Sequence, residues 1–270
     1  MPTILDGKKV AEYRIDILRS TISKFNLHPC LAIITVGSDY ASSVYVRNKL
    51  NACDKIGIAH QHILLPEDIS EKDILLKIRE LNTNPEVNGI IVQLPLPPHI
   101  NKNKILNSIW RSKDVDGFSR DSIFNPCTPE GCLEILSQYN IPIAGKNTLI
   151  IGRSEIVGKP LARMLLDADA TVTVCHSKTP HDELVNHIKN AEIIFSAAGQ
   201  ESLIMPEYVN GNSVIIDISI NRNEDKKICG DVNPDCYPIV RAYTPVPGGV
   251  GPMTVSKLME HTILAAGYQK

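Results

Sequence analysis

The sequence has no excess of charge of either sign. Its 270 residues include 28 lysines and arginines and 30 aspartates and glutamates, and no cluster of basic residues stands out. A protein that binds nucleic acid needs a basic surface to neutralise phosphates. Nucleic acid is therefore not an expected partner.

Long apolar stretches are also missing. No run of about 18 apolar residues is present to span a bilayer, and the first residues, MPTILDGKKVAEY, become charged at residue 6 without the apolar segment of a secretion signal. We therefore expect no membrane partner and a cytoplasmic location.

Metal-binding and disulfide patterns are absent as well. The seven cysteines are scattered and include no C-x-x-C pair, which favours neither a zinc ribbon nor a disulfide framework. His60 and His62 alternate on an expected strand without an H-E-x-x-H partner, so we expect them to be structural. Asp114 and Asp116 begin like a calcium loop, but the third acid is missing and position twelve is Asn125. No metal site is expected.

The sequence does contain a regular alternation of apolar runs with segments of helical period. Helices are expected after Asp39 and after Ser70, where Asp73 stands at a capping-box distance. Because continuous apolar strands separated by helices indicate parallel sheets covered on both faces, the predicted fold class is α/β. The expected strands are residues 30–37, 62–65, 87–94, 147–152, 170–176, 191–197 and 213–219.

The chain is long enough for two lobes. A length of 270 residues suits two domains of ordinary size. Pro142 and Gly145 interrupt the alternation within residues 140–147, just before a new strand, so the boundary is expected there.

Residues 148–166, TLIIGRSEIVGKPLARMLL, are predicted to form a strand, a turn at Gly152 and a helix that opens near Gly158. Backbone N–H groups at such a helix start can bind a pyrophosphate. The match to G-x-G-x-x-G is imperfect, because Ser154 replaces the middle glycine and the last glycine comes one residue late. A dinucleotide site and an ordinary tight strand-to-helix turn therefore both remain open.

Two other kinds of nucleotide site, that of a phosphate-loop NTPase and that of an NAD enzyme, match this segment less well. A phosphate-loop NTPase needs four residues between its glycines, whereas five lie here and Pro160 follows Lys159. The next strand ends in Cys175, His176 and Ser177, where an NAD enzyme commonly carries an acid for the ribose hydroxyls. Without that carboxylate, and with Arg153 and Ser177 available for a 2′-phosphate, the pattern favours NADP.

The first half of the chain carries a candidate catalytic group. Tyr45 and Lys49 are four residues apart and share one face of the expected helix, although such pairs are more often surface decoration. Gln93 lies near the carboxyl end of a buried strand, at the edge where α/β sheets form their clefts.

Seven stretches of the chain carry a combined signature: YVRNK, GIIVQLPLP, KDVDGF, PCTPEG, GRSEIVGKP, TVTVCHS and TPVPGGVGPMT. Together they resemble one family, the bifunctional methylenetetrahydrofolate dehydrogenase/methenyltetrahydrofolate cyclohydrolases. The resemblance implies two α/β lobes facing across a cleft, the second a Rossmann-type dinucleotide-binding domain, and a homodimer. It assigns residues 1–140 and 253–270 to a folate-binding catalytic domain and residues 141–252 to an NADP-binding domain.

The resemblance also implies roles for individual residues. Lys49, Tyr45, Gln93 and Asp116 would be the catalytic residues, and Asp116 would bind the pterin. The side-chain-poor stretch TPVPGGVGPMT, residues 244–254, would border both ligands, with Thr254 starting the last helix. The implied folate contacts are Tyr45, Gln93, Leu94, Asp116, Pro247 and Gly248. The implied NADP contacts are Gly152, Arg153, Ser154, Ile156, Ser177, Ile220, Gly251 and Thr254.

The activity so implied belongs to one-carbon metabolism and purine biosynthesis. The enzyme would oxidise 5,10-methylenetetrahydrofolate to the 5,10-methenyl form with NADP and hydrolyse that product to 10-formyltetrahydrofolate, with Lys49 moving the proton that hydrolysis requires. A dehydrogenase that lacks the cyclohydrolase, and a catalytically silent dinucleotide-binding protein, are the alternatives.

Three features depart from the family pattern. Asn51 stands where a second basic residue is usual, and Ser219 stands where a glycine is common and is expected to crowd the cofactor slightly. The connector SRDSIFN, residues 119–125, is shorter than usual.

Overall fold

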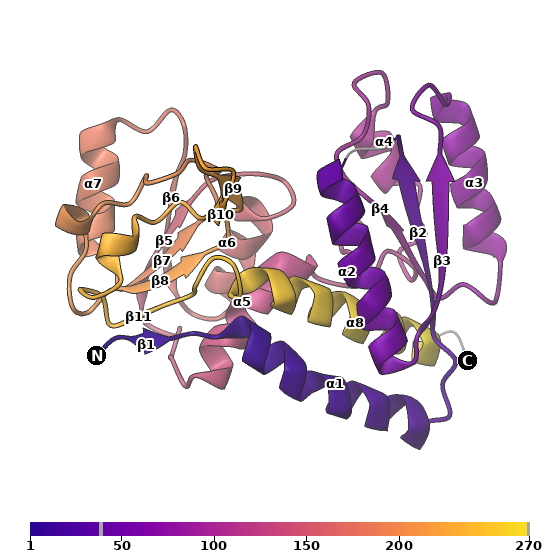
Figure 1. Ribbon diagram of the computed structural model, residues 1–270, viewed down its shortest axis with the longest axis horizontal. Coiled ribbons are helices and arrows are strands. Elements are labelled where there is room, and N and C mark those ends of the chain that lie inside the picture. The colour runs from indigo at the N-terminus through magenta and orange to yellow at the C-terminus, as the bar shows by residue number, and fades with distance from the viewer. Residues whose placement is uncertain (38–39, 269–270) are drawn as a thin grey trace. The chain divides into compact units, whose positions relative to one another are not determined.

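The computed structural model describes residues 1–37 and 40–268, and the chain divides into two compact units. Unit 1 comprises Met1–Ala11 and Thr128–Thr254, and unit 2 comprises Glu12–Cys127 and Val255–Lys270. Helices α1 (Gly7–Lys24) and α8 (Val250–Tyr268) each begin in unit 1 and continue into unit 2 (Figure 1).

Unit 2 is built on a parallel sheet of β2 (Cys30–Val36), β3 (Ala59–Leu65) and β4 (Gly89–Val92) in the order β3-β2-β4. Its two faces follow the alternation of side chains along β2. Ala32 and Ile34 pack with α3 (Glu71–Thr83), whereas Leu31 and Ile33 pack with α2 (Tyr40–Ile56) and α8. The sheet is therefore covered on both faces (Figure 1). A short helix, α4 (Lys102–Leu106), follows β4 in the chain.

Unit 1 holds a six-stranded parallel sheet in the order β1-β11-β8-β7-β5-β6. Its central strands are β5 (Asn147–Ile151), β7 (Ile193–Ser196) and β8 (Val214–Asp217), flanked by β6 (Thr171–Cys175), β11 (Ala242–Tyr243) and β1 (Thr3–Ile4). The chain places β6 on one side of β5 and then β7 on the other. Such a reversal of strand order is where ligands bind in open α/β sheets, at the carboxyl ends of the strands.

Helices cover this sheet as well. One core cluster joins α5 (Cys127–Gln138), α6 (Gly158–Asp167) and the first turn of α8 to one face, and a second joins α7 (His181–Asn190) to the other. Short elements complete the unit: 3-10 turns at Pro206–Tyr208 and Pro234–Cys236, and a hairpin of β9 (Asn221–Arg222) and β10 (Ile228–Cys229).

The predicted α/β class and the predicted strands are confirmed, and so is the helix that Ser70 caps by accepting a hydrogen bond from Asp73 N. One local prediction was wrong: the last helix starts at Val250, so Thr254 lies inside it. The compact units divide at residues 11/12, 127/128 and 254/255, because β1 pairs with β11 and α5 packs on the larger sheet. The division of functions near residues 140–147 stays a prediction.

Among the helices described in residues 1–37 and 40–268, none combines the length and apolar character that crossing a membrane requires.

Candidate active site

Lys49 and Gln93 form a direct contact at the end of the smaller sheet. The ammonium Nζ of Lys49, a residue only 9% exposed, donates to Gln93 Oε1 at 3.0 Å. Gln93 is held in turn, because its side-chain Nε2 donates to Leu94 O at 2.9 Å and its backbone N–H donates to Ile34 O at 2.8 Å. The amide oxygen is thereby directed at the amine, and each group is oriented before any ligand arrives.

The spacing of the helix places Tyr45 next to this pair. Tyr45 precedes Lys49 by one turn of α2, so both residues lie on one face of the helix, and Tyr45 is 39% exposed. Gln93 directly follows β4, at the carboxyl edge of the sheet. The predicted grouping of a helix face with a strand end is therefore present in unit 2.

Asp116 completes the cluster as a buried carboxyl group. It is 7% exposed, and its burial raises its pKa, while the positive charge of Lys49 acts in the opposite direction and Asp114 adds to the increase. Lys49 is thus the cation that most favours the ionised form of Asp116. An amine, an amide and a carboxyl group meet in one part of unit 2.

The other charged residues of the KDVDGF motif have structural contacts. Lys113 is buried, and its Nζ donates to Leu81 O at 3.1 Å and to Asn84 O at 2.7 Å, with burial lowering its pKa. Asp114 Oδ2 accepts from Ser119 N at 2.7 Å, which ties down the start of the short connector. Lys113 and Asp114 of this motif therefore hold the backbone in place, and Asp116 provides the carboxyl group that interacts with Lys49.

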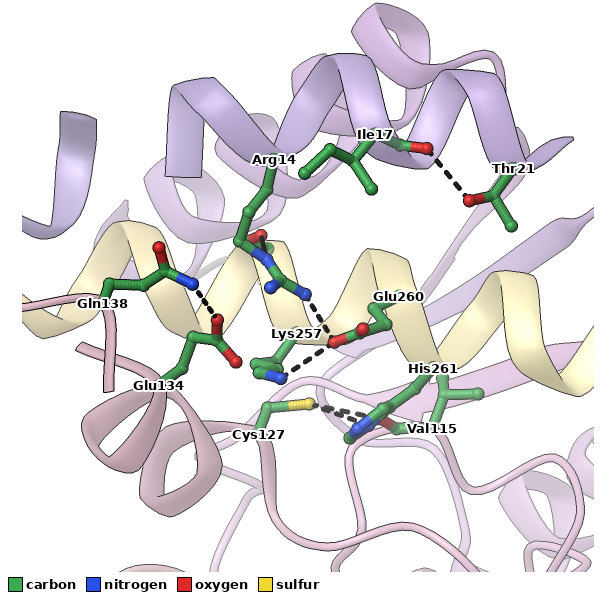
Figure 2. A network of polar contacts seen from close by, with 11 residues as sticks. Arg14, Ile17, Thr21, Val115, Cys127, Glu134, Gln138, Lys257, Glu260 and His261 are labelled. Atoms are coloured by element: carbon green, nitrogen blue, oxygen red, sulfur yellow. Dashed lines mark hydrogen bonds and ion pairs between the residues drawn. The ribbon is translucent and has the colours of Figure 1, made fainter. Parts of the chain in front are cut away.

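The carbonyl group of Val115, the residue before Asp116, is contacted by His261 of α8 and by Cys127 of α5 (Figure 2). His261 Nδ1 lies 2.9 Å from Val115 O, and Cys127 Sγ lies 3.2 Å from the same oxygen. Phe124 stacks on the His261 ring with 4.8 Å between centroids. The sequence did not predict this cluster, because no motif joins His261 to residues almost 150 positions earlier.

A neighbouring ion-pair network joins α1 to α8 within unit 2 (Figure 2). Glu260 Oε2 accepts from Arg14 Nη2 at 2.6 Å and from Lys257 Nζ at 2.9 Å, and Arg14 Nε also donates to Ser256 Oγ at 3.1 Å. Lys257 is buried and Glu260 half-buried, so this network fixes the register of two helices.

In unit 1, the turn after β5 is shaped by two glycines. Gly152 has a φ of +128°, and a Cβ there would lie 2.5 Å from Ala197 O. A Cβ on Gly158 would overlap Gly152 O, so the start of α6 packs directly on the turn. Such close backbone packing is what a dinucleotide-binding turn requires, and the residues present fit a pyrophosphate at this helix start.

Ser154 compensates for the missing middle glycine. Its exposed hydroxyl accepts from Val157 N at 3.2 Å and from Gly158 N at 3.4 Å, at the start of α6. The neighbouring Arg153 is also exposed, and Ile156 is half-buried. Ser154 thus satisfies orphan N–H groups at the helix start that a glycine would leave open.

The register of the sheet brings Arg153 and Ser177 into adjacent loops. Ile151 of β5 pairs with Cys175 of β6, and each of the two residues lies two positions beyond its strand partner. Both side chains are exposed, and no carboxylate stands at the end of β6. The edge is therefore suited to an anion rather than to a ribose diol.

A buried carboxylate network lies at the ends of β7 and β8 and was missed by sequence reasoning. Asp231 accepts five hydrogen bonds, at 2.7–2.9 Å, from Ser196 Oγ, Ala198 N, Gln200 N, Ser219 Oγ and Asn221 Nδ2. Asp217 lies beside it and accepts from Ser219 N and Val232 N. Burial, together with the charge of Asp231, raises the pKa of Asp217 to about 7.

This network changes the interpretation of Ser219. Its hydroxyl donates to Asp231 and accepts from Gly199 N at 3.1 Å, so the side chain points into the protein. The crowding of a cofactor by this side chain stays a prediction, against which its two hydrogen bonds argue. Ile220, the next residue, is the exposed apolar side chain at this strand end.

The glycine- and proline-rich stretch, residues 244–254, lies entirely in unit 1 and includes the first residues of α8. Pro247 is exposed, Gly248 has a φ of +108°, and Gly248 O accepts from Lys8 N at 2.8 Å. Gly251 lies in the first turn of α8 with open space around its Cα. Thr254 Oγ1 donates to Thr128 Oγ1 at 3.1 Å, so this hydroxyl has a partner inside the unit.

Within the described part of the chain, no group of three or more histidine, cysteine, aspartate or glutamate side chains is placed to hold a metal ion.

Comparison with known proteins covers nearly the whole chain. The family profile "Tetrahydrofolate dehydrogenase/cyclohydrolase, catalytic domain" matches residues 5–116, and "Tetrahydrofolate dehydrogenase/cyclohydrolase, NAD(P)-binding domain" matches residues 126–270. The chain is 45% identical to the "Bifunctional protein FolD" of Methanoculleus marisnigri, over 97% of this chain and 96% of that protein.

Solved structures agree with these matches. The bifunctional FolD methylenetetrahydrofolate dehydrogenase/cyclohydrolase of Campylobacter jejuni is 41% identical, with a TM-score of 0.96 and full coverage of both chains. The Trypanosoma brucei FolD structure, described as a complex with NADP cofactor and inhibitor, is 32% identical with a TM-score of 0.94 and covers 99% of this chain and 98% of that one.

Proposed function

The chain belongs to the tetrahydrofolate dehydrogenase/cyclohydrolase family, and we propose that its Lys49, Gln93, Asp116 and Tyr45 form the folate site at which both family reactions occur. The enzyme oxidises 5,10-methylenetetrahydrofolate to the methenyl form with an NAD(P) cofactor and hydrolyses the product to 10-formyltetrahydrofolate. The observation that carries the site is the 3.0 Å contact between the Lys49 amine and the fixed Gln93 amide, next to a buried carboxyl group.

The oxidation asks mainly for alignment. When bound, the cofactor supplies a nicotinamide ring whose C4 accepts the hydride that leaves the methylene carbon. No side chain has to remove a proton, because the folate nitrogens stabilise the cation that forms. Asp116 binds the pterin through its carboxylate, and Leu94 and Tyr45 line the folate.

The hydrolysis requires proton transfer, and Lys49 is the residue that we assign to it. Water adds to the methenyl carbon and loses one proton to leave a hydroxyl group. The bond from that carbon to N5 then breaks, N5 gains a proton, and the hydroxyl group loses its proton as the formyl C=O forms. Two protons are lost and one is gained, so one proton is released overall. Lys49 Nζ, which the Gln93 oxygen holds in place, carries a proton between these atoms.

NADP is the cofactor that the second site fits best. Gly152, Ser154 and Ile156 lie in the turn before α6, where the glycines let a pyrophosphate approach the backbone and the helix dipole favours an anion. Arg153 and Ser177 occupy adjacent strand ends without a carboxylate, which suits the 2′-phosphate of NADP. We assign the nicotinamide side to Ile220, Gly251 and Thr254.

Lys49→Met tests the proposed division of labour. Loss of the proton carrier is expected to reduce cyclohydrolase activity by about 10²- to 10⁴-fold while dehydrogenase activity stays measurable. Lys55→Met, at an exposed position near the end of the same helix, is the matched control and should retain both activities. Full hydrolysis by Lys49→Met would refute the role of the lysine. Wild-type protein that oxidises the folate but does not hydrolyse the methenyl form would identify a dehydrogenase alone.

We further propose, from the family resemblance, that the protein is a cytoplasmic homodimer and that the folate and NADP functions belong to residues 1–140 with 253–270 and to residues 141–252, respectively. Light scattering of the purified protein tests the dimer, and a monomer at micromolar concentration would refute it. Titration of NADP against the isolated fragment 141–252 measures whether these residues bind NADP by themselves and so tests the division of functions.

A further inference from the structure

We infer that His261, on helix α8, is a positioning residue for Asp116: it fixes the peptide between Val115 and Asp116 and thereby the direction in which Asp116 presents its carboxylate to folate. The inference rests on the proposed folate site and adds to it a residue that no sequence motif indicates. All of the contacts that carry it lie within unit 2.

The direction of the hydrogen bond follows from its acceptor. Val115 O can only accept, so the His261 Nδ1 atom at 2.9 Å must carry the proton and donate it. The Cys127 thiol, with Sγ at 3.2 Å from the same oxygen, is a second donor, and its Sγ lies 3.5 Å from His261 Nδ1. Two donors from α8 and α5 therefore converge on one carbonyl group (Figure 2).

Asp116 is held from both sides by these contacts. The carbonyl before it is bound by His261, and its own carbonyl accepts from Cys127 N at 3.3 Å. With the backbone fixed at both peptides, only the side-chain torsions of Asp116 remain free.

The imidazole itself is immobilised by packing. His261 is 3% exposed and stacks on Phe124 with an interplanar angle of 22°. Phe124 is part of the short connector between Asp116 and Cys127, whose base is closed by Gly117, where a Cβ would overlap Asn125 O. A donor that is buried and stacked in this way fixes its acceptor to within a few tenths of an ångström, as the supporting partners of metal ligands and catalytic groups do.

His261 is too deeply buried to touch a substrate, so its effect must pass through Asp116. His261→Leu keeps most of the side-chain volume and removes the N–H donor, which leaves Val115 O with the weaker thiol donor. One lost hydrogen bond to a positioned group corresponds to about a five- to tenfold rise in KM for methylenetetrahydrofolate. The kcat and the KM for NADP are expected to stay within about twofold, since the donor acts on folate binding alone.

The experiment compares His261→Leu with His261→Asn, whose amide nitrogen can replace Nδ1 as donor. His261→Asn is expected to restore a wild-type KM for the folate, a rescue that a purely structural role would not predict. His28→Leu, at an exposed histidine of the same unit, is the control. In an Asp116→Asn background, His261→Leu should raise KM no further, because the group that it positions has already been changed.

The outcomes separate the inference from the function on which it rests. An unchanged KM in His261→Leu, a fall in kcat without a change in KM, or an effect that persists in the Asp116→Asn background would overturn the inference alone. Wild-type protein without folate turnover, or Asp116→Asn with an unaltered KM, would overturn the folate site and the inference together. If His261→Leu does not fold, Phe124→Leu releases the imidazole from its stack, and an unchanged folate KM there overturns the inference.

Discussion

Replacing Asp217 by asparagine is expected to remove a pH dependence from the stability of the folded chain. Asp217 is 1% exposed, and its burial, together with the charge of Asp231, raises its pKa from 3.8 to about 7. Between those values the folded protein binds a proton that the unfolded chain does not. The contribution of Asp217 to the free energy of unfolding is therefore greatest below pH 4, falls as the pH rises to about 7, and is constant above that.

The size of the effect follows from the pKa difference. About three units correspond to about 4 kcal/mol across the window, because each unit is worth about 1.4 kcal/mol. The asparagine of Asp217→Asn stays neutral, and its single side-chain oxygen can accept from only one of the two N–H groups, that of Ser219 or that of Val232. The other N–H group faces the side-chain NH2 and loses its acceptor, at a cost of about 1–3 kcal/mol. The variant should thus be less stable than the wild type at pH 5 and equal to it or more stable at pH 8.

Urea unfolding followed by far-UV circular dichroism, at several values between pH 5 and pH 8.5, measures this difference. Asp235→Asn, at an exposed position of the same unit, controls for the loss of one negative charge and should give a constant offset. A difference between wild type and Asp217→Asn that does not vary with pH would show that Asp217 does not titrate in this window, which would refute the reasoning.

Three further predictions concern the cofactor edge of unit 1. Gly158→Ala places a Cβ against Gly152 O and should raise the NADP dissociation constant at least about tenfold in a fluorescence titration, since the turn must move; unchanged binding would contradict this. Ser219→Gly removes a hydrogen bond to Asp231 and should lower stability by about 1 kcal/mol in thermal unfolding without tightening NADP binding, whereas tighter binding would support crowding by the serine. Arg153→Ala should reduce the ratio of kcat/KM with NADP to that with NAD about tenfold, and an unaltered ratio would remove Arg153 from the 2′-phosphate site.

Local sequence patterns were enough to predict the elements that carry the candidate site. The four-residue spacing of Tyr45 and Lys49 places both on one face of α2, and Gln93 follows an apolar run that forms β4. Helical period, strand alternation and the glycines at 152 and 158 are properties of neighbouring residues, so they can be read without knowing the rest of the chain.

Contacts between distant segments could not be predicted in this way. The bond from His261 to Val115 spans 146 positions and that from Arg14 to Glu260 spans 246. The two-residue strand β1 has no pattern of its own, and it forms a strand only because β11 offers it an edge. For the same reason no local pattern indicated that residues 1–11 join the compact unit of the larger sheet.

The sequence by itself determined the α/β class, most of the strands and the types of group available for chemistry, because periodicity and turn residues act over a few positions. Tertiary structure alone decided that Ser219 points toward Asp231, that Asp217 is buried beside that carboxylate, and that His261 donates to the carbonyl before Asp116. These choices depend on which buried donors and acceptors must satisfy one another once the core has closed, and that condition is set by packing and not by spacing along the chain.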